Sequence, residues 1–155
     1  SVRLPTVTVQ TGAPSRSATT FLSGMVRGPM AGLECIVSTE DRAARQVMCS
    51  PLVINGSFFR IMHAPNNALP ASIRVVYMPG ISVTLGDMYD AFVEVCGKEK
   101  LALLRTERDA ECSRLLNSWP QTEDLGNARR LGLVFDEDCR QILQEYVDGL
   151  KPKGA

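Results

Sequence analysis

The sequence contains few of the residues that build metal sites and disulfide frameworks. Its 155 residues include one histidine, His63, so a site with several histidine ligands cannot form within this chain. The five cysteines are odd in number and widely spaced, and no Cys-x-x-Cys pair occurs. We therefore expect no disulfide framework and no metal site. Cys96 and Cys139 fall on apolar helix faces and are expected to be buried free thiols, and His63, at the end of an apolar helix, to have a structural role.

Motifs that would make the chain a self-contained enzyme are also missing. Neither a G-x-G-x-x-G nor a G-x-x-x-x-G-K phosphate loop occurs, and there is no G-x-S-x-G nucleophile elbow. Each of the three tyrosines is followed four positions later by an aliphatic residue, so no Tyr-x-x-x-Lys pair is present to act as a proton acceptor. We predict no catalytic residue within this chain.

Basic and acidic residues are equal in number. The chain has 17 basic and 17 acidic residues, and no lysine precedes Lys98. This balance argues against a nucleic-acid surface and a polybasic membrane patch. No apolar run approaches the roughly 20 residues that span a bilayer. We expect neither nucleic acid nor membrane as a partner.

The first residues are rich in β-branched side chains, which is typical of an internal strand. Val2, Thr6, Val7, Thr8 and Val9 form an extended segment before the breaks at positions 12 and 14. Strands that are apolar on both faces are usually covered on both faces. We therefore expect the chain to be the C-terminal portion of a longer protein, with residues 2–9 left with an unpaired edge.

Hydrophobic periodicity and breakers predict a mixed α/β chain. The expected helices span residues 19–27, 50–63, 84–96, 107–117 and 136–148. The expected strands span residues 2–9, 33–37, 45–49, 73–78 and 101–104. We expect Ser17 to cap the first helix and Gly28-Pro29 to end it. Thr84 and Asp87 form an expected capping box, and Asp136, Glu137 and Asp138 are read as partners of a helix dipole.

Several ordered motifs carry a resemblance to a known family. They are Arg3-Leu4-Pro5-Thr6-Val7, Gly12-x-Pro14 with Ala18-Thr19-Thr20-Phe21, Val26 to Gly32, Ser50-Pro51, Met78 to Thr84, and Ser118-Trp119-Pro120. In this order and spacing the chain resembles the C-terminal part of extended short-chain dehydrogenases/reductases, the NAD-dependent epimerase/dehydratase family. The likeness is closest to the D-erythronate dehydrogenase branch.

The resemblance implies a fold and a division of the chain. The fold would be α/β, with the last strand of a Rossmann-type parallel sheet followed by a smaller α+β substrate-binding lobe. Residues 1–18 would be the remnant of the dinucleotide-binding domain, residues 19–150 the substrate-binding lobe, and residues 151–155 a flexible tail. The glycine-rich loop and the Tyr-x-x-x-Lys pair would lie upstream, so NAD or NADP would be bound mainly by residues outside this chain.

The resemblance also implies site residues. Pro5, Thr6 and Val7 would lie beside the nicotinamide, and Thr6, Thr19 and Thr20 would face the substrate. The alternative is that Thr6 is only a strand former and Thr20 only a helix-start residue.

The loop at residues 10–15 departs from the family pattern. Gln10-Thr11-Gly12-Ala13-Pro14-Ser15 stands where the family tends to have Arg-Pro-Gly-Lys-Pro-Asn, so two cations are missing. An acid substrate needs a positive partner in a closed site. Arg16 or Arg27 would supply it, unless the acid is not bound here.

Three functions remain open from the sequence. The first is the C-terminal portion of an NAD-dependent oxidoreductase acting on a small sugar acid or hydroxy acid, catalytically incomplete as given. The second is a non-catalytic interaction or structural subunit derived from a short-chain dehydrogenase, and the third is an unrelated ligand-binding α/β domain. The expected partners are the missing N-terminal Rossmann portion, a small-molecule substrate and a second copy in a homodimer, in the cytoplasm.

Overall fold

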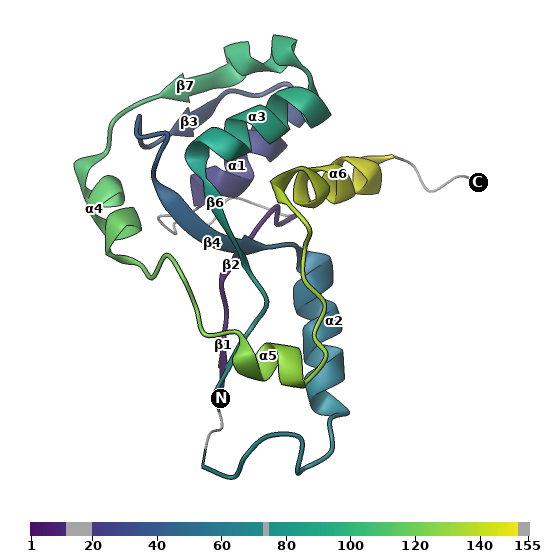
Figure 1. Ribbon diagram of the computed structural model, residues 1–155. Coiled ribbons are helices and arrows are strands. Elements are labelled where there is room, and N and C mark those ends of the chain that lie inside the picture. Colours follow the sequence, from purple (N-terminus) through teal and green to yellow (C-terminus); the bar gives the residue numbers. More distant parts are fainter. Residues whose placement is uncertain (12–19, 73–74, 152–155) are drawn as a thin grey trace.

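The computed structural model describes residues 1–11, 20–72 and 75–151. They form a mixed α/β structure with a broad upper part and a narrow lower part (Figure 1). The strands are β1 (Val2–Arg3), β2 (Thr6–Val7), β3 (Cys35–Val37), β4 (Arg45–Cys49), β5 (Val76–Tyr77), β6 (Ile81–Thr84) and β7 (Leu104–Thr106). The helices are α1 (Thr20–Met30), α2 (Pro51–Met62), α3 (Leu85–Cys96), the 3₁₀ helix η1 (Lys98–Leu103), α4 (Ala110–Ser118), α5 (Gly126–Arg130) and α6 (Cys139–Leu150).

Parallel pairing dominates the strands, as the predicted fold class requires. β1 pairs in parallel with β5, β2 with β4, and β3 with β7, while β6 runs antiparallel to β4. β4 is the central strand of the order β2-β4-β6. The α/β fold with parallel strands is therefore confirmed.

The first strand differs from its prediction. Residues 2–9 form two short strands separated by Leu4 and Pro5, because proline has no N–H for a ladder. Each short strand has a partner within the chain, and Thr8 N continues the second ladder by donating to Cys49 O at 2.8 Å. The expectation that this segment lacks a partner was wrong for one of its edges, since strands from residues far along the chain pair with it.

Two hydrophobic clusters hold the described residues together. The larger lies among α1, α3, α4, α6 and β4, with Leu22, Met25, Met88, Phe92 and Leu143 at its centre. The smaller joins the following residues from the lower part: Cys49, Val53, Ile54, Val76, Met78, Ala128 and Leu133. Val2 and Val7 pack against this smaller cluster. The predicted domain boundary at residue 18 lies outside the described residues, and the division into domains stays a prediction.

Local signals at two helix starts are confirmed. Ser50 caps α2 by accepting from Val53 N at 3.1 Å, with Pro51 at the first helical position. In α3, Thr84 Oγ1 accepts from Asp87 N at 3.0 Å and Asp87 Oδ2 accepts from Thr84 N at 2.8 Å, which completes the capping box. Gly97 ends α3 with φ of 96°, a conformation that favours glycine.

Several helices and strands begin or end at other residues than the sequence predicts. α1 runs through Gly28-Pro29 to Met30, because a proline in the last turn forfeits one hydrogen bond while its ring is buried. Residues 101–104, predicted as a strand, lie mostly in η1, and β7 follows them. The short elements β6 and α5 were not predicted. The predicted capping role of Ser17 falls outside the described residues.

The acidic run before α6 has more than one role. α6 begins at Cys139, and Asp138 caps it by accepting from Gln141 N at 2.7 Å. Asp136 is instead buried, and its Oδ2 accepts from Ser50 N at 2.8 Å at the start of α2. Treating Asp136 as a simple dipole partner of α6 was therefore wrong. No helix among the described residues is long and apolar enough to cross a bilayer.

Candidate functional site

A cleft of about 510 Å³ opens where the N-terminal segment, α1, β4 and the segment after α4 meet. Its volume falls within the range of small-molecule sites. The cleft is lined by Leu4, Pro5, Thr6, Val7, Gln10, Thr20, Ser23, Arg27, Gln46, Val47, Trp119, Pro120 and Glu123.

Five of the residues predicted for a site line this cleft. Pro5, Thr6 and Val7 come from β2 and the residue before it, and Thr20 and Arg27 come from the first and last turns of α1. Arg16 and Thr19 lie outside the described residues. Two segments that are separate in sequence are thus placed on one cavity, although their roles toward a ligand stay predictions.

The β2 wall is fixed by pairing and by close packing. Thr6 and Val7 are held opposite Met48 and Cys49 of β4. Pro5 is buried against Gly80, where an added Cβ would lie 3.0 Å from Pro5 Cβ and 2.6 Å from Val47 Cγ1. A side chain at position 80 would therefore push on both walls of the cleft.

Hydrogen bonds attach α1 to the segment that follows β2. Ser23 Oγ lies 2.9 Å from the buried Thr8 Oγ1 and accepts from Gln10 N at 3.2 Å. One turn later, Arg27 Nη1 donates to Gln10 O at 3.1 Å. The backbone carbonyl of Gln10 thus holds the guanidinium of Arg27 at the cleft.

Sequence reasoning missed four polar or aromatic lining residues: Ser23, Gln46, Trp119 and Glu123. Gln46 is buried, and its Nε2 donates to Leu116 O at 3.2 Å. Trp119 belongs to the Ser118-Trp119-Pro120 motif, which carries the resemblance but predicts no role for its side chain. Glu123 lies in an irregular segment, and no pattern in the sequence distinguishes it from other surface acids.

Glu123 introduces a second sign of charge to the cleft. Among the described residues that line it, Arg27 is the sole cation and Glu123 the sole acid. Burial raises the pKa of the Glu123 carboxyl. Within the described residues, Glu123 Oε2 is buried and finds no hydrogen-bond partner. The cleft therefore offers hydroxyls, amides, one guanidinium and one carboxyl for binding and orienting a polar molecule.

The thiols and acids elsewhere offer less chemistry. Burial raises the pKa of Cys49 and of Cys139 to about 12 and that of Cys96 to about 11, so these thiols stay protonated and unreactive. Within residues 1–11, 20–72 and 75–151, no group of three or more His, Cys, Asp or Glu side chains is placed to hold a metal ion.

Two curated proteins are similar in sequence to nearly all of this chain. No family model matches the chain. It is 27% identical to D-erythronate dehydrogenase of Haemophilus influenzae over 147 residues, which are 95% of this chain and 46% of that protein. It is 28% identical to D-erythronate dehydrogenase of Cupriavidus necator over 149 residues, 95% of this chain and 45% of that protein.

Solved structures share the fold. A nucleoside-diphosphate-sugar epimerase of Agrobacterium tumefaciens superposes with a TM-score of 0.89 at 26% identity, over 96% of this chain and 43% of the other. The chain resembles the C-terminal part of an extended short-chain dehydrogenase/reductase. L-threonine 3-dehydrogenase of Trypanosoma brucei, with a TM-score of 0.80 at 20% identity over 96% of this chain and 45% of the other, shares the fold alone. The chain spans just under half the length of the curated relatives it matches.

Proposed function

We propose that this chain forms the substrate-binding part of an NAD-dependent oxidoreductase that acts on a small sugar acid or hydroxy acid of the D-erythronate type. The observation that carries the proposal is that three predicted site residues line one cleft of about 510 Å³. Thr6 and Thr20 are predicted from the resemblance, and Arg27 as a substitute for the cations missing from residues 10–15. Sequence similarity to D-erythronate dehydrogenases over 95% of the chain supports the oxidoreductase class.

The cleft has one wall suited to a nicotinamide and another suited to a substrate. Leu4, Pro5, Val7 and Val47 form an apolar surface on which a flat ring can lie. Nothing in this chain resembles a pyrophosphate-binding loop, so NAD or NADP would be held mainly by residues outside it. The chemistry supplied by such a cofactor would be acceptance of a hydride from the substrate carbinol carbon.

The polar wall would orient the acid. Arg27 would pair with the substrate carboxylate by charge-assisted hydrogen bonds, and Arg16 remains the second candidate for this role. Thr6 and Thr20 would hydrogen-bond substrate hydroxyls, since each hydroxyl both donates and accepts. The base that removes the carbinol proton would come from the N-terminal Rossmann portion.

The proposal also includes a homodimer and a cytoplasmic location.

One observation favours a second function. Gln10 to Ser15 lacks the two cations of the family pattern, which fits a non-catalytic subunit that no longer binds an acid. The position of Arg27, held at the cleft by Gln10 O, argues for the first function, because a charge remains at the cleft.

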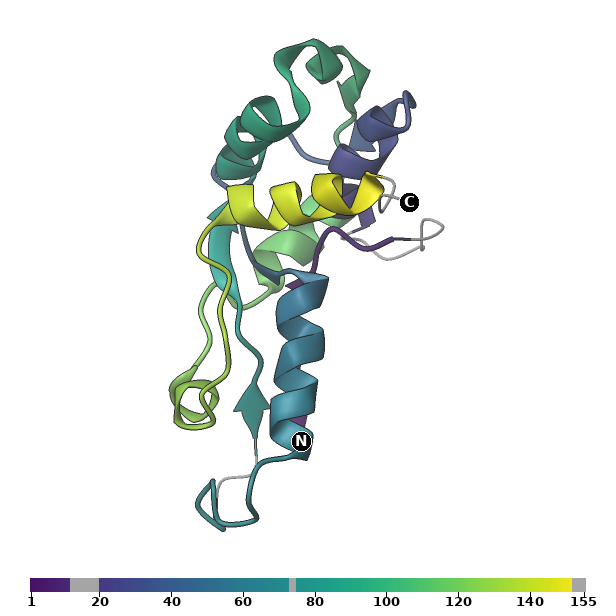
Figure 2. The same cartoon turned by 90° about the vertical axis from the view of Figure 1, so that its right-hand side faces the viewer.

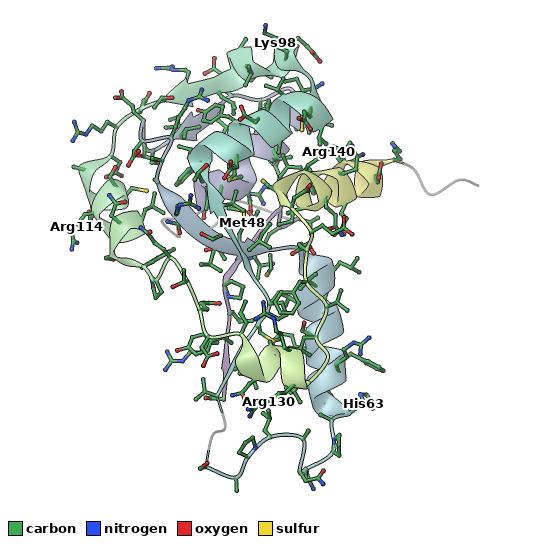
Figure 3. All side chains as sticks on the ribbon, in the orientation of Figure 1. Met48, His63, Lys98, Arg114, Arg130 and Arg140 are labelled. Carbon is green, nitrogen blue, oxygen red and sulfur yellow. The ribbon has the colours of Figure 1, made fainter. Side chains whose placement is uncertain are left out.

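Calorimetric titration with D-erythronate separates the two functions. We expect saturable binding that weakens by about tenfold or more in Arg27→Ala, as for the loss of a charge-assisted hydrogen bond of about 1.5–3 kcal/mol. Arg114→Ala is the matched control, since Arg114 projects from α4 at the outer edge of the molecule and does not line the cleft (Figure 3). Binding that is unchanged in Arg27→Ala, or absent from the folded wild-type chain, would contradict the proposal.

A further inference from the structure

Among the described residues that line the cleft, Glu123 alone has a buried side-chain oxygen without a hydrogen-bond partner. Its Oε2 is buried without a hydrogen-bond partner, although a buried polar atom without a partner is costly and uncommon in folded proteins. The residue lines the same cleft as Thr6 and Arg27. A molecule bound there can supply the missing partner.

Trp119 and Pro120, both exposed to solvent, line the same cleft as this carboxyl. Burial raises the pKa of the Glu123 carboxyl. An ionised carboxylate accepts hydrogen bonds from hydroxyls, and a protonated carboxyl can also donate to a hydroxyl oxygen.

We infer that Glu123 is a specificity-determining residue that hydrogen-bonds the hydroxyls of a polyhydroxy acid, at the end of the molecule away from the carboxylate. This inference rests on the proposed function, in which the carboxylate goes to Arg27. The cleft then selects an acid with hydroxyls along its chain over one with a single hydroxyl. An acid group directed at Glu123 would be rejected by like charge whenever the glutamate is ionised.

An ammonium group is the other ligand chemistry that a carboxyl attracts. It would make the preferred substrate an amino acid, with the ammonium on Glu123 and the carboxylate on Arg27. The hydroxyl assignment is favoured because the chain shares sequence with D-erythronate dehydrogenases over 95% of its length, whereas the L-threonine 3-dehydrogenase of Trypanosoma brucei shares the fold alone.

The test compares ligands that differ only in their hydroxyls. D-erythronate, 2-hydroxybutyrate and L-threonine are titrated into the isotope-labelled wild-type chain, Glu123→Ala and Glu123→Gln, and binding is followed by amide chemical shifts. Glu111→Ala and Glu111→Gln are matched controls, because Glu111 is exposed on α4 and does not line the cleft. Amide spectra away from the cleft that overlay with those of the wild type show that each variant is folded.

The inference predicts a change in selectivity. The wild-type chain should bind D-erythronate about tenfold more tightly than 2-hydroxybutyrate, which corresponds to one or two hydrogen bonds. Glu123→Ala should lose most of this ratio, and Glu123→Gln should keep it within about threefold because an amide still donates and accepts. The Glu111 variants should match the wild type.

Three results would overturn the inference. If Glu123→Ala keeps the full ratio of affinities for D-erythronate and 2-hydroxybutyrate, the carboxyl does not hydrogen-bond the hydroxyls of the ligand. If L-threonine binds more tightly than D-erythronate and Glu123→Gln loses binding as fully as Glu123→Ala, the ligand group is an ammonium. If the wild-type chain binds none of the three acids, both the proposed function and the inference are wrong. The first two results contradict the inference alone, because an acid still binds at the cleft.

Discussion

The upper and lower parts of the molecule differ in how completely their apolar surfaces are covered. In the upper part, α1, α3 and α6 enclose a core in which Phe92 and Leu143 are nearly inaccessible. In the lower part, α2 runs along the side of the molecule that faces the viewer in Figure 2. Its Val53 and Ile54 pack in the smaller cluster, whereas Leu52, Phe59 and Met62 are exposed by 66%, 64% and 79%. The upper part also exposes Leu33, Ile36 and Leu150, but these lie on separate segments, whereas the exposed apolar side chains of α2 gather on one helix.

An exposed apolar helix face of this kind marks a surface that packs against something else. The curated relatives are about twice as long as this chain, so about half of their length has no counterpart here.

The largest expected effect comes from the upper core. Phe92→Ala removes a side chain that is 1% exposed and should cost about 3–5 kcal/mol of unfolding free energy. Leu133→Ala in the smaller cluster should cost about 2 kcal/mol, because the smaller cluster has fewer buried members and can collapse further around the missing atoms. Denaturant unfolding followed by amide signals in each part measures both values. Equal costs would show that the two parts are packed alike.

A smaller effect is expected where the two parts meet. Gly80→Ala places a methyl group 2.6 Å from Val47 Cγ1 and 3.0 Å from Pro5 Cβ, and should destabilise by about 1–3 kcal/mol and weaken ligand binding at the cleft. Gly56→Ala is the control, since an added Cβ there meets nothing within 4 Å and should stabilise α2 by about 0.5–1 kcal/mol. If Gly80→Ala is neutral in both stability and binding, the close packing does not shape the cleft.

The sequence predicted the elements whose signals are local. Ser50-Pro51 and the Thr84–Asp87 box mark helix starts because the capping hydrogen bonds join residues within one turn. It failed where distant residues decide the structure. The partners of residues 2–9 in the sheets lie far along the chain, at Val76 and Met48. The burial of Asp136 depends on a hydrogen bond from the backbone N–H of Ser50, 86 positions away. Glu123 belongs to the same class, because only the folded chain brings it to the cleft.

The smallest expected effect is a pH dependence confined to the upper part. Hydrogen bonds from the backbone N–H and the hydroxyl of Thr84 lower the pKa of Asp87. Because the folded pKa lies below the unfolded one, the stabilisation is present above the unfolded value, about 3.9, and is lost as pH falls through the folded pKa. The difference in unfolding free energy between the wild type and Asp87→Asn should therefore be present at pH 7 and disappear in stronger acid.

Thermal unfolding at pH 7 and at successive acidic pH values measures this gap. Asp90→Asn, an exposed acid on the same helix, should change stability little at each pH. A gap for Asp87→Asn that persists unchanged in acid would show that the capping box acts without its charge.

The central claim is that the cleft between β2 and α1 binds the sugar acid, and Thr6 tests it most directly. Thr6→Val keeps the shape and the strand preference of the side chain and removes its hydroxyl. In a chemical-shift titration with D-erythronate, the account predicts saturable shifts at residues 4–10, 20–27 and 119–123, with about tenfold weaker binding in Thr6→Val, equal to about 1.4 kcal/mol. Equal affinity in the two folded proteins, or shifts gathered on α2 instead, would contradict it.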